Sequence, residues 1–362
     1  MKTIKAIYYS IVPSPYQRDL FYQLSCLPEL DIKVYYLEPG SPDSPWPSKS
    51  LQPYEHILPG SQYISWSPSQ RFLFNRHWPN LNDTDIVVVN GYNGLVPQVV
   101  MHYWAKRIPC IFWGEKISPL SSGLRGKLQY LLKQGLQHCQ AIAAIGSLAQ
   151  EDYRKYYPHK PVFNIPYYCD LSEFMRDRPS RPRDPITILF CGQMIYRKGV
   201  DLLLKSFEKV IHAGYHARLL LIGIEAELPE MMANIADPVK QWICYAGFQA
   251  PSDLPKYFRQ ADIFVLPSRY DGWGVVVNQA LGAGLPLICS DQVGAAYDLI
   301  DTNHNGYIFP NGDLNALTNA IIDYIAKPNL LKFSSESSYQ RASLWSPEFG
   351  AKQWVDTLQQ FI

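Results

Sequence analysis

Short apolar runs alternate along the chain with longer stretches in which apolar residues recur every three or four positions. The runs are rich in Val, Ile and Leu, which favour buried strands, and the longer stretches have the period of amphipathic helices. In the first half the predicted strands are residues 4–9, 32–37, 85–90, 110–113, 141–145 and 161–165. In the second half they are residues 186–191, 217–224, 242–246, 262–266 and 285–290. This alternation predicts an α/β fold with doubly wound parallel sheets.

The length of 362 residues predicts two domains, because a single core of this size is uncommon. Residues 176–185, RDRPSRPRDP, hold three prolines and four arginines and are interpreted as the linker between domains 1–175 and 186–345. Residues 346–362 start with Ser346 and Pro347 and predict a final helix with an apolar stripe. Residues 39–80 are rich in Pro, Ser, Trp and Tyr and are interpreted as a long irregular functional loop.

Charge changes this picture only locally. With 33 Lys and Arg against 32 Asp and Glu the net charge is +1, which disfavours nucleic acid as a partner. The region 101–140 nevertheless carries Lys106, Arg107, Lys116, Arg125, Lys127 and Lys133 against one acid, Glu115. Two interpretations of this region stay open: peripheral contact with an anionic membrane, or an ordinary solvated helix face.

The cysteines are single and odd in number, without a CxxC pair, and predict reduced, buried thiols; they are Cys26, Cys110, Cys139, Cys169, Cys191, Cys244 and Cys289. The first ten residues, MKTIKAIYYS, have too short an apolar stretch for a signal peptide, and no run of 18 apolar residues occurs. The expected location is therefore cytoplasmic.

The first candidate site is the stretch GQMIYRKG, residues 192–199, between a predicted strand and a predicted helix. A glycine turn, Arg197, Lys198 and a helix N-terminus together favour binding of a diphosphate. The alternative is that both cations are solvated loop residues.

The second candidate site, PSRYDGWGVVVNQA, covers residues 267–280 and follows another predicted strand. Asp271 lies in its turn, and Gln279 lies eight residues later, about two helical turns along. A carboxylate at the turn suits sugar hydroxyls and a polar side chain on the helix suits a ribose, whereas the alternative is a structural cap with an exposed glutamine.

These stretches, with IPYYCD at 165–170, AGFQ at 246–249 and HNGYIFPNGD at 304–313, resemble retaining glycosyltransferase family 4, most strongly over residues 185–325. The resemblance implies the GT-B fold, in which two Rossmann-like domains face a central cleft, and a final helix that crosses back to the N-terminal domain. It implies a nucleotide diphosphate sugar, most often a UDP-sugar, as co-substrate in the C-terminal domain and the acceptor in the N-terminal domain. The donor-binding residues it implies, besides Lys198 and Asp271, are Gly192, Gln193, Gly247, Phe248, Ser268, Gly272, Trp273, Gly274, Val275 and Gln279.

Two positions depart from the family pattern. Gln193 stands where many members have Arg, so Arg197 is expected to supply that charge. Gln279 stands where nearly all have Glu, and a neutral acceptor in place of a charged one weakens donor binding by about tenfold. A catalytically silent nucleotide-sugar-binding or partner subunit is therefore the alternative function.

We expect catalysis without a metal, because members of this group place protein cations and helix dipoles on the leaving diphosphate. The expected catalytic residues are Arg197, Lys198, Asp271 and Glu115. Asp83 and Asp85 form a D-x-D sequence, but it lies at the start of a strand, at the wrong end of the sheet for a metal site in the crevice. On the acceptor side Glu115 suits orienting or deprotonating a hydroxyl, with a salt bridge to Lys116 or Arg125 as the alternative. The other acceptor-side candidates follow predicted strands and are Ser14, Tyr16, Arg18, Asn90 and Tyr92.

The predicted activity is a retaining hexosyl transfer to a hydroxyl of a glycan, glycolipid or small-molecule acceptor. A nucleotide-sugar epimerase on the same fold is a further rival. A Rossmann dehydrogenase is disfavoured because SIVPSPYQ, not G-x-G-x-x-G, follows the first strand.

Overall fold

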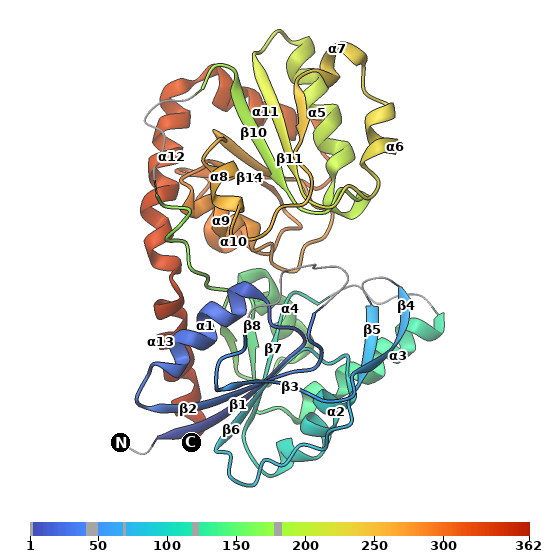
Figure 1. Ribbon diagram of the computed structural model, residues 1–362, viewed down its shortest axis with the longest axis vertical. Coiled ribbons are helices and arrows are strands. Elements are labelled where there is room, and N and C mark those ends of the chain that lie inside the picture. Colours follow the sequence, from blue (N-terminus) through green and yellow to red (C-terminus); the bar gives the residue numbers. More distant parts are fainter. Residues whose placement is uncertain (1–2, 41–49, 68–69, 118–122, 177–182) are drawn as a thin grey trace. The chain divides into compact units, whose positions relative to one another are not determined.

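The computed structural model describes residues 3–40, 50–67, 70–117, 123–176 and 183–362. The chain divides into two compact units. Unit 1 comprises Met1–Cys169 together with Pro347–Ile362, and unit 2 comprises Asp170–Ser346 (Figure 1). Of the predicted linker, residues 177–182 lie outside the described residues.

The sheet of unit 1 is parallel, with the strand order β3-β2-β1-β6-β7-β8-β9. Its strands are β1 (Ile4–Ser10), β2 (Leu30–Tyr36), β3 (Glu55–Ile57), β6 (Ile86–Asn90), β7 (Cys110–Gly114), β8 (Ala141–Ala144) and β9 (Val162–Asn164). Its helices are α1 (Pro15–Ser25), α2 (Leu95–His102), α3 (Gly123–Lys133), α4 (Ser147–Tyr156) and α13 (Pro347–Leu358), with the short turns η1 (Trp104–Lys106), η2 (Gln134–His138) and η5 (Gln359–Phe361). The central strands are buried along nearly their whole length, as a sheet covered on both faces requires.

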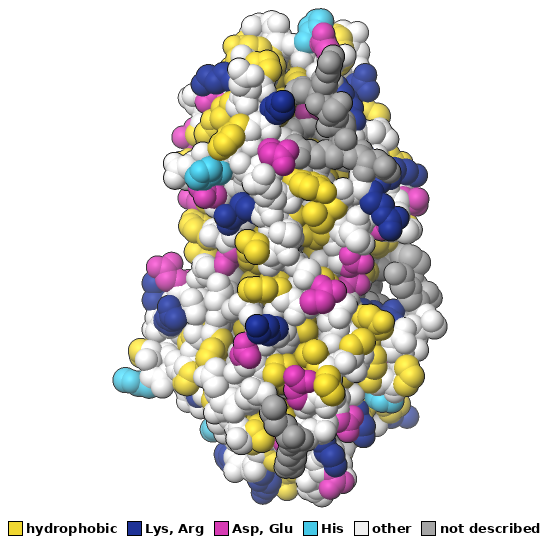
Figure 2. All heavy atoms as spheres, turned by 90° about the vertical axis from the view of Figure 1, so that its left-hand side faces the viewer, with side chains coloured by type: hydrophobic (Ala, Val, Ile, Leu, Met, Phe, Trp, Pro, Cys, Tyr) yellow, Lys and Arg dark blue, Asp and Glu magenta, His cyan; other side chains and the backbone are white. Residues whose placement is uncertain are grey.

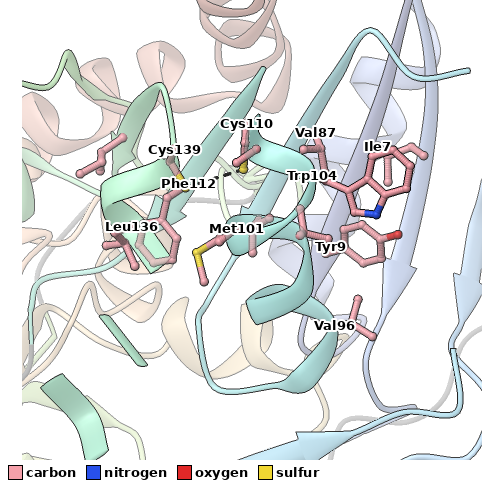
Figure 3. Close-up of a cluster of buried hydrophobic side chains, with 14 of the residues drawn as sticks. Ile7, Tyr9, Val87, Val96, Met101, Trp104, Cys110, Phe112, Leu136 and Cys139 are labelled. Carbon is pink, nitrogen blue, oxygen red and sulfur yellow. Dashed lines mark hydrogen bonds between the residues drawn. The ribbon is translucent and has the colours of Figure 1, made fainter. Parts of the chain in front are cut away.

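One face of this sheet is covered by a cluster of buried side chains that includes Tyr9, Met101 and Phe112 (Figure 3). The Sγ atoms of Cys110 and Cys139 lie 3.7 Å apart within it. The hydrogen bond to Cys139, together with burial, raises the pKa of the Cys110 thiol. All seven cysteines are free, but the prediction of burial is wrong for Cys26 and Cys244, which are exposed.

Helix α13 closes unit 1 although it comes from the far end of the sequence. Trp354 is fully buried, with ring centroids 5.5 Å from Tyr8 and 5.3 Å from Trp113. Gln23 Nε2 on α1 donates a hydrogen bond to Glu348 Oε1 on α13 at 2.9 Å. The last helix is therefore part of the core of unit 1, and not an appendage.

The segment 39–80 is more regular than its composition suggests. It contains β3 and an antiparallel hairpin of β4 (Gln62–Ser67) and β5 (Gln70–Phe74), in which Tyr63 pairs with Leu73 and Ile64 with Phe72. The prediction of a wholly irregular loop is wrong because cross-strand pairing, which a single strand's composition does not reveal, orders these residues. Residues 41–49 and 68–69 of this segment are outside the described part.

The sheet of unit 2 is also parallel, with the order β12-β11-β10-β13-β14-β15. Its strands are β10 (Ile186–Cys191), β11 (Ala217–Ile222), β12 (Ile243–Tyr245), β13 (Ile263–Leu266), β14 (Leu287–Ser290) and β15 (Gly306–Phe309). Its helices are α5 (Val200–His212), α6 (Leu228–Ala233), α7 (Asp237–Lys240), α8 (Leu254–Phe258), α9 (Val276–Gly282), α10 (Ala296–Leu299), α11 (Leu314–Ala326) and α12 (Pro328–Ala342), with η3 (Tyr196–Lys198) and η4 (Ser343–Trp345). The predicted α/β class with two parallel sheets is confirmed.

Two surface properties complete the description. Among the described residues, no helix combines the length and the apolarity needed to cross a bilayer. On the face drawn in Figure 2, basic and acidic side chains are scattered among each other rather than gathered by sign, so this face carries no field of one sign.

Candidate functional site

In unit 2 the chain reverses direction between two neighbouring strands. From β10 it proceeds to β11 and β12 on one side, and it then returns to β13 on the other side of β10. Ligands of such sheets bind beyond the carboxyl ends of the strands at this point, because the two following loops diverge there. The two candidate stretches, residues 192–199 and 267–280, follow β10 and β13 and therefore meet at this edge.

An ion pair joins these two loops. Lys198 Nζ lies 2.5 Å from Asp271 Oδ2, and the two side chains are only 14% and 12% exposed. Arg197 is exposed, and its guanidinium donates to the carbonyl of Tyr270 at 3.0 Å. Three of the residues proposed for catalysis are thus gathered in one place, with the cations beside the carboxylate.

Glycines let the backbones of the loops approach each other closely. Gly199 has φ +73°, and a Cβ there would lie 2.0 Å from the carbonyl oxygen of Pro267. Gly223, after β11, has φ +138°, and a Cβ there would lie 1.8 Å from the carbonyl oxygen of Gly192. No other residue fits at these positions, so backbone groups form the walls of this edge.

The loop after β14 holds the turn that contains Asp271. The amide of Asp271 donates to Gln292 at 3.1 Å, and the carbonyl of Asp271 accepts from the amide of Gly294 at 3.1 Å. The amide of Ala295 donates to the carbonyl of Trp273 at 2.9 Å, and Gly274 follows with φ +92°. Residues 271–274 are therefore fixed before any ligand arrives.

Two predicted donor-binding side chains are buried in the core. The ring of Trp273 is 1% exposed, and its Nε1 donates to Asn278 Oδ1 at 2.8 Å. Ser268 is fully buried, and its carbonyl accepts from Ser290 Oγ. Both side chains thus pack inside the turn, and donor binding by these two residues stays a prediction.

The other predicted donor-side residues lie nearer the surface. Gly192, Gln193, Val275 and Gln279 are partly exposed. Gly247, with φ +74°, accepts a hydrogen bond at its carbonyl from Gly223, and the next ring, Phe248, is 44% exposed. An exposed phenyl ring at the end of β12 is suited to packing against a planar base.

Unit 1 has a polar network at the corresponding edge of its own sheet, where the strand order reverses between β1 and β6. Gln17 Oε1 accepts from Ser10 Oγ at 2.8 Å and from Ser14 Oγ at 2.9 Å. Gln17 Nε2 donates to Asn90 Oδ1 at 3.0 Å, and Asn90 Nδ2 donates to the carbonyl of Trp113 at 3.0 Å. The hydroxyl of Ser14 thus pairs with Gln17 and does not cap α1, which begins at Pro15.

Glu115 joins this network through a tyrosine. Tyr167, which is 5% exposed, forms side-chain hydrogen bonds with Asn90 and Glu115, and its ring centroid lies 4.8 Å from that of Tyr16. Burial raises the pKa of Tyr167 well above its usual value, and the charge of Glu115 raises it further. Glu115 itself is exposed at the end of β7. Ser14, Tyr16, Asn90 and Glu115 therefore belong to one cluster.

Two predicted acceptor-side residues have other partners. Arg18 forms a bidentate ion pair with Glu55, at 2.8 Å from Nε and 2.6 Å from Nη2, which is a structural role. Tyr92 packs on the core, 6.1 Å from Phe112 between ring centroids, and burial raises its pKa to about 12. Sequence reasoning missed Gln17 and Tyr167, although Tyr167 lies in the stretch IPYYCD that carries part of the family resemblance.

In the part of the chain that the structure describes, no group of three or more His, Cys, Asp or Glu residues could hold a metal ion. Asp85 of the D-x-D sequence accepts a hydrogen bond from the amide of Lys5 at 2.9 Å. This contact lies where β6 begins, at the edge opposite to the polar network.

Residues 185–327 match the profile of a family described as Glycosyl transferases group 1. Among curated proteins, a GDP-mannose-dependent monoacylated alpha-(1-6)-phosphatidylinositol monomannoside mannosyltransferase of Corynebacterium glutamicum is 24% identical over 259 residues, which are 66% of this chain and 66% of the relative. An uncharacterized glycosyltransferase of Methanocaldococcus jannaschii is 28% identical over 130 residues, 35% of this chain and 33% of the relative. The aligned part thus spans one third to two thirds of these relatives.

Similar solved structures cover nearly the whole chain. A sucrose-phosphate synthase from Thermosynechococcus elongatus superposes with a TM-score of 0.72 at 17% identity, covering 99% of this chain and 98% of the other. The lipopolysaccharide outer core galactosyltransferase WaaB superposes with a TM-score of 0.74 at 12% identity, covering 99% and 100%. The fold is therefore that of the GT-B glycosyltransferases, and the resemblance to group 1 enzymes is confirmed.

Proposed function

We propose that the chain is a glycosyltransferase, and the premise is the match of residues 185–327 to the glycosyl transferases group 1 family. It takes a sugar from a nucleotide diphosphate sugar, with UDP as the first donor to test, and transfers it to a hydroxyl with retention. The observation that carries this proposal is the ion pair of Lys198 with Asp271 at the strand reversal of unit 2. It holds a cation for the diphosphate and a carboxylate for sugar hydroxyls side by side.

Donor binding rearranges this pair. A diphosphate gives Lys198 a second anion, and Asp271 then accepts hydrogen bonds from sugar hydroxyls. Arg197 adds a cation where Gln193 leaves the family's arginine missing. Lys198 and Arg197, with the amides of residues 272–274, stabilise the diphosphate as charge develops on it.

The reaction breaks the bond between the sugar carbon and the phosphate oxygen, whose electron pair stays on the diphosphate. The acceptor oxygen attacks from the same face of the sugar. Glu115 accepts a hydrogen bond from the acceptor hydroxyl and takes its proton, while Tyr167 positions the Glu115 carboxylate. No metal is needed, because Lys198 and Arg197 supply the positive charge.

The first test is thermal melting against a panel of UDP-, GDP-, ADP- and dTDP-sugars in the presence of a chelator, with release of free nucleotide scored in parallel. A donor at about 100 times its Kd stabilises the folded protein by about 2.7 kcal/mol, which raises Tm by several degrees. One donor is expected to raise Tm and to be turned over. No shift with any donor would contradict the donor site, and a shift without turnover after addition of acceptors would favour the silent binding subunit.

A variant without the Lys198 charge tests whether the ion pair of Lys198 with Asp271 marks the donor site. Lys198→Met is expected to weaken binding of that donor by about 10- to 100-fold, since a charge-assisted contact is worth about 1.5–3 kcal/mol. The matched control is Lys205→Met, which removes an exposed cation from α5 and should leave the titration unchanged. Equal donor affinities for the two variants would remove Lys198 from the site.

A further inference from the structure

Helix α3 exposes apolar side chains on its outer face. Leu128 is 42% exposed, Tyr130 57% and Leu131 62%, and Lys127 beside them is exposed too. Leu128 and Leu131 are three residues apart and therefore lie on one side of the helix. The inner side is already used, because Leu132 is 9% exposed and its carbonyl accepts from Gln98 Nε2 on α2 at 2.9 Å. We call Lys127, Leu128, Tyr130 and Leu131 the α3 face.

The end of α4 extends this surface. Tyr157 OH donates to the carbonyl of Lys133 at 3.2 Å, and Lys160 Nζ donates to the carbonyl of Gln137 at 2.8 Å. These bonds bring the end of α4 beside the end of α3. Arg154, Lys155 and Tyr156 in that last turn are all exposed, with Tyr156 at 67%.

The surrounding segment is strongly basic. Residues 101–160 contain nine Lys and Arg but only three Asp and Glu, which are Glu115, Glu151 and Asp152. Because the whole chain has 33 basic and 32 acidic residues, the remainder is net negative. The exposed leucines thus lie inside the positive part of a chain that is close to neutral.

We propose that the α3 face, with Arg154, Lys155 and Tyr156 of α4, docks on the surface of an anionic lipid bilayer. Leucines at the depth of the acyl boundary, tyrosines at the headgroups and flanking cations are the chemistry of an interfacial helix. The cations select anionic headgroups within a Debye length. A second copy of the chain is a poorer occupant, because it would bring Lys127 and the α4 cations against their own counterparts.

The test uses the full chain and two kinds of vesicles, phosphatidylcholine alone and phosphatidylcholine mixed with phosphatidylglycerol. The chain is expected to co-sediment with the anionic vesicles, to stay in solution with the neutral ones, and to be released by high salt. This readout needs no donor, acceptor or turnover, so it is independent of the proposed transferase activity.

Matched variants assign the contact to the α3 face. The double variant Leu128→Gln with Leu131→Gln is expected to weaken vesicle binding about tenfold or more, since it removes two apolar side chains from the bilayer boundary. Leu344→Gln changes a leucine that is 57% exposed in unit 2 and should bind as the unchanged chain does. Lys127→Glu should weaken binding, whereas Lys205→Glu should not. Unchanged Tm values establish that the variants fold.

Three results would overturn this proposal. They are absence of binding to anionic vesicles, equal binding to neutral and anionic vesicles, and unchanged binding of the double leucine variant. A dimer in analytical ultracentrifugation that the double variant converts to a monomer would assign the α3 face to a contact between copies instead.

Discussion

At the scale of single residues, the candidate donor site depends on two glycines, because it has no room for a Cβ atom at either position. Gly199 and Gly223 leave room for carbonyl oxygens that a methyl group would displace. The strand ends can therefore come together closely enough for the ion pair of Lys198 with Asp271 to form. A substitution that adds a Cβ at either glycine should therefore lower the stability of unit 2 and weaken ligand binding.

Gly223→Ala is expected to destabilise unit 2 by about 3 kcal/mol or more, because its Cβ would lie 1.8 Å from the carbonyl oxygen of Gly192. Gly214→Ala is the control, since Gly214 also has a positive φ of +84° but open space around its Cβ. The control should cost only about 1–2 kcal/mol of backbone strain. Urea unfolding of both variants checks this, and equal losses would mean that φ alone, without the close contact, governs Gly223.

Gln279→Glu is expected to tighten binding of the nucleotide sugar by about tenfold, since a carboxylate accepts a stronger hydrogen bond from a ribose hydroxyl than an amide does. Gln279 is partly exposed on α9, so the added charge does not have to be buried. Isothermal titration with the donor found in the melting panel measures the change. Unchanged or weaker affinity would argue against a ribose contact at this position.

How far these residues could be predicted depends on what their role needs. Lys198 and Asp271 stand in motifs whose glycines and strand ends are visible in the sequence, and the structure brings them together. The burial of the Trp273 ring could not be predicted, because a sequence does not reveal which side of a turn faces the core. Gln17 and Tyr167 were missed, because both act through a hydrogen bond with Asn90. That partner lies 73 residues from Gln17 and 77 residues from Tyr167 in the sequence.

At the scale of elements, one carboxylate joins α1, β2 and β3. Glu55 on β3 accepts from Arg18 on α1 and from Tyr36 OH on β2, the latter at 2.6 Å. Burial acts to raise the pKa of Glu55, but Arg18, the amide of Gln52 and Tyr36 together bring it below its usual value. This contact explains why residues 55–57 form an edge strand that apolar patterning did not predict.

The sign of the pH effect follows from the lowered pKa. Above the unfolded value of about 4.3 the ionised Glu55 contributes its full stabilisation, which is lost as pH falls through the lower folded value. Glu55→Gln should cost about 3 kcal/mol at neutral pH and should flatten the loss of stability as pH falls below about 5. Urea unfolding across this range measures both.

The control for that variant is Glu173→Gln. Glu173 pairs with Arg176 at 2.8 Å, but both side chains are more than half exposed, so its loss should have little effect. A Glu55 variant as stable as this control, with an unchanged pH profile, would show that the buried pair does not hold β3 in place.

The hairpin of β4 and β5 marks the limit of prediction at this scale. Strands β1, β6, β7 and β10 could be predicted from their short apolar runs, because both of their faces are buried. The hairpin leaves Tyr63 and Ile64 largely exposed, and its first strand contains two serines. Each strand of the hairpin is held by pairing with the other strand rather than by burial. Local composition does not reveal which segment the partner strand is.

At the scale of the whole molecule, unit 1 is built from two separate parts of the sequence. Removal of residues 347–362 is expected to uncover Tyr8 and Trp113, which pack against Trp354. Hydrogen exchange should then show lost protection in β1 and α1, with β10 and β13 in unit 2 unchanged. Equal protection in the shortened and full chains would mean that α13 is dispensable for unit 1.

The same arrangement sets an order of events at the ribosome. Residues 1–169 leave the exit tunnel first, but α13, which closes their core, is made only after the whole of unit 2. At about 5–20 residues per second this interval is on the order of ten seconds. During that time the nascent unit 1 exposes the apolar surface that α13 later covers. Its folding during synthesis therefore depends on protection of that surface until α13 emerges.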